Sequence, residues 1–170
     1  VLELINFSIF LIKNPIQNKL SKINWWNLRL YSKGGKATFL LNSKTNPNIL
    51  DVGCGIGGNT EFLMNSGYEL EALSPDDFQK SVINDKFANK VTFHHCKFED
   101  FQADKKFDLI LESESACYIN IKEGFSNARK ALRDGGYLLA SDYFVYFRDT
   151  SRSPHLKSSH DLKKYLASAE

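Results

Sequence analysis

An acidic residue followed by alternating glycines gives the sequence its clearest chemical signal. Asp51 precedes Gly53, Gly55 and Gly57, and it follows a short apolar run that begins at Ile49. Glycines let the backbone adopt left-handed conformations and let a ligand approach closely. A carboxylate in this place would repel a pyrophosphate and suits a ligand that carries an ammonium and a sulfonium group. The pattern therefore predicts a nucleotide-like cofactor at the end of a buried strand.

A second group of polar residues follows another apolar run. Residues 112–118 read Glu-Ser-Glu-Ser-Ala-Cys-Tyr and come directly after a predicted strand at 106–111. Doubly wound sheets place their chemistry at the carboxyl ends of the strands. The segment is therefore a candidate part of the site, and a capping cluster for the next helix is the alternative.

Alternating strand and helix patterns must position these two segments. Hydrophobic periodicity predicts an α/β fold with a doubly wound, mostly parallel sheet. Glycine, proline and serine clusters separate the elements. Strands are expected at 49–52, 68–73, 90–96, 106–111 and 137–144, and helices at 58–65, 76–86, 121–132 and from residue 160 onward.

The chain divides into two parts. Residues 1–45 are predicted to be a mostly helical segment, and residues 46–170 form the domain that holds the cofactor. The apolar stretch 1–12 is too short for a membrane span and is expected to be a helix that packs on the domain, with a membrane or partner contact as the alternative. Trp25, Trp26 and Tyr31 are candidates for a lid over the site or, equally, for core aromatics.

Composition narrows the class of protein. The 170 residues are 42% hydrophobic and 25% charged with a net charge of +2, which suits one domain with a full core. No basic run with interleaved aromatics supports a nucleic-acid partner. Cys54, Cys96 and Cys117 form no Cys-x-x-Cys pair, which indicates a reducing compartment and a cytoplasmic protein. His94 and His95 are adjacent, so on a strand they face opposite ways, and no metal site is expected.

The segment 48–60 resembles motif I of the class I S-adenosylmethionine-dependent methyltransferases. The resemblance covers residues 48–145 well, including Phe107 with Asp108 and a Leu-Arg-Asp-Gly-Gly-x-Leu run that begins at Leu132. It implies a Rossmann-like methyltransferase fold, S-adenosylmethionine as cofactor and methyl transfer to a small molecule. The cyclopropane synthase-like and tocopherol methyltransferase-like groups are the most similar branches. The family's last two strands have no counterpart in this sequence, so the domain is expected to be incomplete at its C-terminal end.

The resemblance also implies roles for individual residues. The acid of motif I binds the methionine amino group, and the glycines pass beside the methionine and ribose. The ribose acid of many relatives is absent, because Ala72 stands in its place, so Ser74 and Gln79 are expected there, with Asp77 as an alternative. The full expected set for the cofactor is Asp51, Gly53, Cys54, Gly55, Gly57, Ser74, Gln79, Phe98 and Glu99 at the adenine, and Glu112 at the methionine part.

The acceptor side is implied in the same way. Glu114 would accept a proton or stabilise a developing cation, and Tyr118 would orient the acceptor. Asp142 and Tyr143 lie near the exit of the last strand and are candidates for the acceptor pocket. The sequence does not identify the acceptor, the methylated atom or the oligomeric state.

Two other functions remain open at this point. A nicotinamide-dependent oxidoreductase would need an acid about 20 residues after the glycines, and Glu71 lies close to that distance. A non-catalytic protein of the same fold would bind the cofactor or a partner without turnover.

Overall fold

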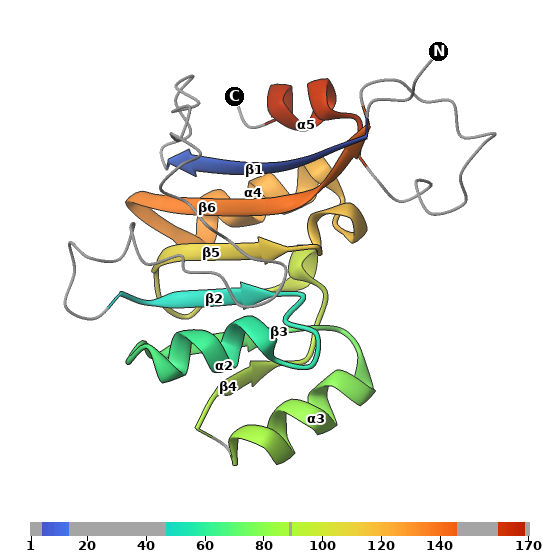
Figure 1. Cartoon of the computed structure of the whole chain (residues 1–170). Helices are drawn as coiled ribbons and strands as arrows, with labels where there is room; N and C mark the ends of the chain where they lie inside the picture. The colour runs from blue at the N-terminus through green and yellow to red at the C-terminus, as the bar shows by residue number, and fades with distance from the viewer. Residues whose placement is uncertain (1–4, 14–46, 89, 146–159, 169–170) are drawn as a thin grey trace.

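The computed structural model describes residues 5–13, 47–88, 90–145 and 160–168 (Figure 1). These residues form a six-stranded sheet in the order β1-β6-β5-β2-β3-β4. The strands are β1 (Ile5–Lys13), β2 (Ile49–Val52), β3 (Leu70–Leu73), β4 (Thr92–His94), β5 (Phe107–Ser113) and β6 (Leu132–Val145). All pairs are parallel except β1 with β6. The predicted doubly wound, mostly parallel sheet is confirmed.

The helices follow the predicted order closely. They are α2 (Gly58–Asn65), α3 (Asp77–Phe87), α4 (Ile121–Ala131) and α5 (Leu162–Ser168), with short 3-10 turns η1 (Phe98–Asp100) and η2 (Ala116–Tyr118). Side-chain caps fix where they begin: Asp76 accepts the N–H of Gln79 at α3, and Asn120 accepts two N–H groups at α4. Within the described residues, no helix has the length and apolar character that a membrane crossing requires.

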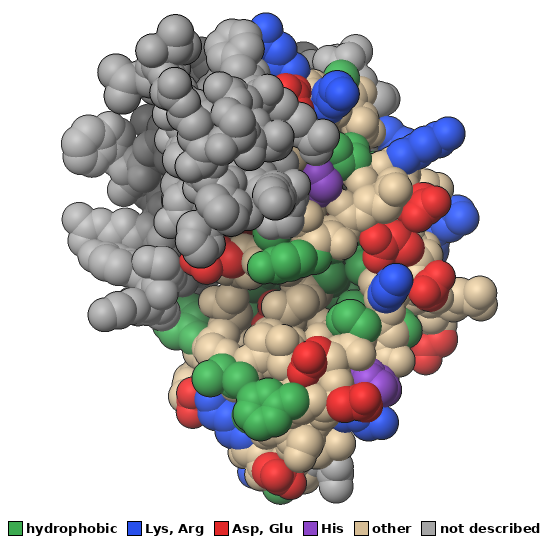
Figure 2. Space-filling model, turned by 90° about the vertical axis from the view of Figure 1, so that its right-hand side faces the viewer, with side chains coloured by type: hydrophobic (Ala, Val, Ile, Leu, Met, Phe, Trp, Pro, Cys, Tyr) green, Lys and Arg blue, Asp and Glu red, His purple; other side chains and the backbone are tan. Residues whose placement is uncertain are grey.

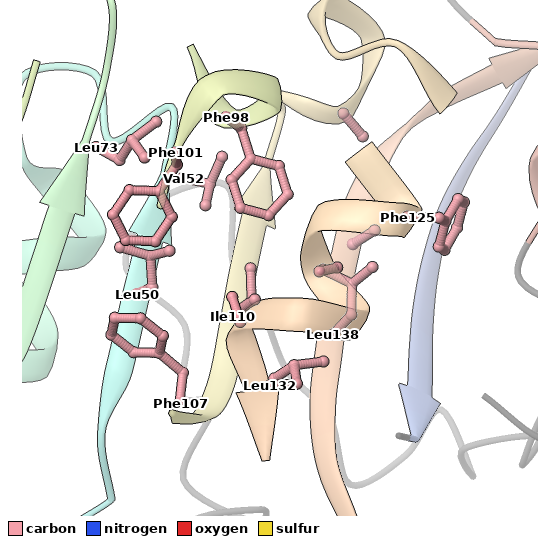
Figure 3. Close-up of a cluster of buried hydrophobic side chains, with 14 of the residues drawn as sticks. Leu50, Val52, Leu73, Phe98, Phe101, Phe107, Ile110, Phe125, Leu132 and Leu138 are labelled. Atoms are coloured by element: carbon pink, nitrogen blue, oxygen red, sulfur yellow. The ribbon is translucent and has the colours of Figure 1, made fainter. Parts of the chain in front are cut away.

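Residues of β2, β5 and β6 are buried on both faces of the sheet and alternate between these faces. Leu50 of β2, Ile110 of β5 and Leu138 of β6 pack with Phe125 of α4 in one cluster (Figure 3). Their neighbours along the strands pack on the opposite face with Leu63 of α2. Each fully buried leucine or isoleucine stabilises the fold by about 1.5–3 kcal/mol relative to an exposed one. Period-two alternation with helices on both faces is what gives these strands their continuous apolar runs.

The order of the strands reverses between β2 and β5. From β2 the chain adds β3 and β4 on one side, and it then returns to add β5 and β6 on the other. Ligands of open α/β sheets bind at the carboxyl ends of the strands at such a reversal. The loops that follow β2 and β5 carry the two polar segments identified in the sequence, so the fold brings these segments to one place.

The N-terminal prediction requires a correction. Residues 5–13, expected to be helical, form β1, which runs antiparallel along β6 with Ile5 opposite Val145. Residues 5–9 read Ile-Asn-Phe-Ser-Ile. This alternating pattern with β-branched and aromatic residues favours a strand. β1 pairs with the edge of β6 that was expected to be exposed. Trp25, Trp26 and Tyr31 lie outside the described residues.

Candidate functional site

The glycine loop after β2 lies against the loop after β5. Gly53 has a φ of +67°, and a Cβ atom added there would clash with the Cβ of Ser115 and lie 3.1 Å from its Oγ. The hydroxyl of Ser115 donates a 2.6 Å hydrogen bond to the carbonyl of Val52. Only glycine therefore satisfies both the backbone conformation and the close approach at position 53.

Asp51 lies beneath this loop rather than on its surface. Its side chain is buried, and it accepts a 2.7 Å hydrogen bond from the hydroxyl of Thr60 in α2. Burial raises the pKa of Asp51 to about 6, and the hydrogen bonds from Thr60 oppose that rise. A buried acid of this kind ionises readily once a cation is placed beside it.

The loop after β5 is held in an unusual backbone conformation. Glu114 has a φ of +57°, a value that costs a non-glycine residue about 1–2 kcal/mol. Its N–H donates a 2.7 Å hydrogen bond to the carbonyl of Ser141, and the N–H of Cys117 donates at 2.9 Å to the Asp142 carboxylate. These contacts offset the strain and direct Glu114 away from the strand. Such strain is common where a side chain is placed for function.

A cavity of about 570 Å³ opens where these loops meet. Its size falls in the range of small-molecule sites. Figure 2 views the face at which the parallel strands end, and hydrophobic and acidic side chains gather there. The predicted site residues that line the cavity are Gly53, Gly55, Ser74, Gln79, Phe98, Glu99, Glu114 and Tyr118.

Ser74 and Gln79 meet at the side of the cavity that α3 forms. The hydroxyl of Ser74 donates a 2.7 Å hydrogen bond to the Gln79 side chain, because the first turn of α3 returns Gln79 to the end of β3. Gln79 thus reaches the cavity together with Ser74. Asp77 does not line it: its side chain is 93% exposed and forms an ion pair with His95 at 3.4 Å.

Two further residues that line the cavity also stabilise the fold. Phe98 is buried in the core with Leu73 and reaches the cavity from η1. The Glu99 carboxylate accepts a 2.7 Å hydrogen bond from the N–H of Asn120. One Glu99 oxygen therefore fixes the start of α4, while the residue remains part of the cavity wall.

Four residues expected at the cofactor do not line the cavity. Asp51 lies below the loop, and Gly57, in the left-handed conformation, precedes α2, where an added Cβ would meet Ile83 and Phe87 at 2.7 Å. Cys54 is buried, and burial together with the charge of Asp51 raises its pKa to about 12, so its thiol stays protonated. Glu112 is the fourth residue that does not line the cavity.

Glu112 is buried beside α5. The hydroxyl of Tyr165 in α5 donates to its carboxylate at 3.2 Å. Burial raises the pKa of Glu112 to about 7, the hydrogen bond from Tyr165 lowers it, and the nearby charges of Asp142 and Glu99 raise it further. Glu112 is therefore engaged with Tyr165 and does not line the cavity. The Asp142 carboxylate supports the loop after β5 through the Cys117 N–H. The side chain of Tyr143 lies outside the described set.

The sequence did not single out two exposed apolar residues in the segments around this cavity. Ile56 in the glycine loop and Phe78 in α3 are 62% and 69% exposed. The only sign of these residues in the sequence is that each is an apolar residue within an otherwise polar segment. Ser115 and Thr60, which hold the two loops, were also missed because their roles depend on contacts distant in sequence.

Glu71, the acid considered for a nicotinamide cofactor, forms contacts away from the cavity. Glu71 accepts from His94 at 2.6 Å and pairs with Lys105 at 2.5 Å, and it does not line the cavity. The described part of the chain contains no group of three His, Cys, Asp or Glu side chains arranged for a metal ion.

The chain is similar in sequence to known methyltransferases. A family model described as a methyltransferase domain matches residues 27–168. Malonyl-[acyl-carrier protein] O-methyltransferase 2 of Ilyobacter polytropus is 30% identical over 147 residues, which cover 75% of this chain and 56% of that protein. A phosphoethanolamine N-methyltransferase of Triticum aestivum is 32% identical over 135 residues, which cover 75% of this chain and 25% of that protein. The chain thus spans about half or less of the length of these curated relatives.

A solved structure gives the same likeness in three dimensions. It is phosphoethanolamine N-methyltransferase 2 of Haemonchus contortus, in complex with phosphomonomethylethanolamine and S-adenosylhomocysteine. It superimposes with a TM-score of 0.64 at 20% identity and covers 74% of this chain and 32% of that one. At this identity the likeness shows a shared fold.

Proposed function

The chain belongs to the methyltransferase domain family, and on that premise we propose that it transfers a methyl group from S-adenosylmethionine to a small molecule. The observation that carries the proposal is the contact between the two strand ends. The Ser115–Val52 hydrogen bond holds the glycine loop and the Glu114 loop side by side, and both loops line one cavity. A cofactor and an acceptor held by these loops would meet in that cavity.

The residues present fit this cofactor. Gly55 has a φ of +57°, and an added Cβ would meet no protein atom within 4 Å, so the loop leaves room for a ligand. We infer that Asp51 holds the amino group, that Ser74 and Gln79 bind the ribose, and that Phe98 and Glu99 border the adenine. A buried carboxylate of pKa about 6 becomes a stable anion when an ammonium group compensates for its burial. Glu112 is engaged with Tyr165 and is a weaker candidate.

When bound, S-adenosylmethionine supplies a methyl group that its sulfonium already activates. The protein's own contribution is then mainly to hold the acceptor in line with that methyl group. Glu114 and Tyr118 both line the cavity and come from the loop after β5. In the proposed reaction Glu114 takes the acceptor's proton or balances a developing positive charge, and Tyr118 orients the acceptor.

The charge of the cavity favours an acceptor without a negative charge. Among the described lining residues, Asp76, Glu99 and Glu114 are acidic, and Lys97 is the one base. A cavity with an excess of carboxylates concentrates cations and repels anions. We infer that amines and neutral molecules are better acceptors than free carboxylates or phosphates.

We also propose that the protein works in the cytoplasm and does not act on nucleic acid. Cys54, Cys96 and Cys117 are all free thiols, which suits a reducing compartment. The small net charge and the acidic cavity do not favour binding of a phosphate backbone.

Thermal unfolding with S-adenosylhomocysteine, and separately with NAD, tests the cofactor. A ligand at 100 times its Kd adds about 2.7 kcal/mol, which is several degrees for a domain of this size. Stabilisation by the first ligand alone is expected. Transfer of labelled methyl groups to ethanolamine, phosphoethanolamine and malonate then tests the reaction. Cofactor binding with no transfer to any acceptor in a wider screen would favour the non-catalytic alternative.

A further inference from the structure

A histidine near the end of the chain contacts the turn that carries Tyr118. The Nε2 atom of His160 lies 2.8 Å from the carbonyl oxygen of Ala116 and 2.8 Å from that of Ile119. Carbonyl oxygens only accept hydrogen bonds, so the Nε2 atom must carry the proton and donate to both. One N–H group therefore holds the first residue of η2 and the residue directly after it.

Besides His160, the Asp142 carboxylate holds this turn by accepting a 2.9 Å hydrogen bond from the Cys117 N–H. η2 is a three-residue 3-10 turn, closed by the Tyr118 N–H donating to Ser115 at 3.1 Å and the Ile119 N–H donating to Ala116 at 3.2 Å. Isolated 3-10 turns have poor hydrogen-bond geometry. The Tyr118 side chain is 79% exposed, so its position depends on the backbone of the turn.

His160 is itself fixed by the hydrophobic core that includes Tyr165. Its ring stacks on Tyr165 of α5 with the two ring planes 20° apart. Tyr165 is buried, contacts Phe125 and Phe144 at ring distances of 4.9 and 4.8 Å, and donates its hydroxyl to Glu112. The hydrophobic core thus holds α5, and α5 holds the histidine.

We propose that His160 is a positioning residue for methyl transfer, which sets the place of Tyr118 at the cavity by holding both ends of η2. This assignment rests on the proposed function, since Tyr118 is taken to orient the acceptor. His160 itself does not line the cavity. Its loss should therefore affect the acceptor side and leave the affinity for S-adenosylhomocysteine unchanged.

Hydrogen exchange of the full chain provides a test that does not require turnover. In His160→Ala, the amides of Tyr118 and Ile119 are expected to lose protection, while those of the glycine loop keep it. In His160→Gln, the side-chain amide can donate to both carbonyls and should restore protection. With the best acceptor found in the methyl-transfer screen, His160→Ala should lower kcat/KM by roughly tenfold to a hundredfold, as small displacements of reacting groups do.

Tyr165→Phe is the matched control. It removes the hydrogen bond to Glu112 from the same helix but keeps the ring contacts. It should lower the melting temperature and leave the exchange of Tyr118 and Ile119 unchanged. Unchanged exchange in His160→Ala, or equal loss of protection in all three variants, would overturn the assignment. The proposed function would fail separately, if the wild-type protein lacked the stabilisation by S-adenosylhomocysteine.

Discussion

The side chain of Ser115 occupies the space into which a Cβ atom at Gly53 would project. The same serine donates its hydroxyl to the carbonyl of Val52, one residue before that glycine. This pair therefore sets the distance between the cofactor loop and the acceptor loop. The geometry of the proposed reaction depends on a contact between residues 62 positions apart.

Gly53→Ala is expected to disrupt the loop. The substitution adds a side chain at a φ of +67° and a clash with Ser115, which together cost roughly 2–4 kcal/mol. Urea unfolding measures this loss. The double variant Gly53→Ala with Ser115→Gly should recover only the part caused by the clash. Full recovery would show that backbone conformation contributes nothing at this site.

Affinity for S-adenosylhomocysteine should rise with pH through about 6. The buried Asp51 must ionise to hold the ammonium group, and its pKa in the free protein is raised to about 6. Below this value affinity should fall by up to about tenfold per pH unit, because a proton must be lost on binding. Calorimetric titration at pH 5, 6 and 7.5 measures the slope. Asp51→Asn should bind weakly and without the slope, and a parallel slope in that variant would assign the effect to another group.

Glu114→Gly should make the protein more stable and less active. Glycine adopts the φ of +57° without strain, so unfolding should cost about 1 kcal/mol more. Methyl transfer should fall because the carboxylate is lost. Glu114→Gln keeps the backbone strain and the shape of the side chain. Its activity therefore measures what the carboxylate contributes to methyl transfer. A Gln variant as active as the wild type would remove Glu114 from the proposed chemistry.

Stability should fall as pH rises from about 4.5 to about 7, in part through Glu112. Its pKa is raised from 4.5 to about 7 in the folded protein, so the folded state holds the proton more tightly than the unfolded state. The resulting stabilisation is complete below pH 4.5 and lost as pH passes 7. Glu112→Gln should flatten this part of the curve in urea unfolding. Glu69→Gln, at an exposed position, should leave the curve unchanged.

Local patterns in the sequence were enough to predict the sheet and the glycine loop. The alternation of apolar residues fixes the strand faces, and the end of β2 places the loop. The proximity of Ser74 and Gln79 was also predictable, because both residues follow one strand. The first turn of α3 is what brings the two side chains together.

Contacts distant in sequence explain what could not be predicted. The side chain of Glu112 was expected near the cofactor, but it lies beside Tyr165, 53 residues later. The left-handed backbone of Glu114 results from its hydrogen bond with Ser141, which no local pattern reveals. β1 was expected to be helical, and no local pattern reveals its pairing, because its partner β6 begins only at Leu132.

The pairing of β1 with β6 also sets the timing of folding during synthesis. β1 leaves the ribosome before every other strand of the sheet, yet its partner begins at Leu132. At ordinary elongation rates the strand waits on the order of ten seconds for that partner. β1 can pair only after the parallel strands β2 to β5 have been translated. Pairings this distant in sequence are slow to form, so closure of this edge is expected to be the late, rate-limiting event in maturation of the domain.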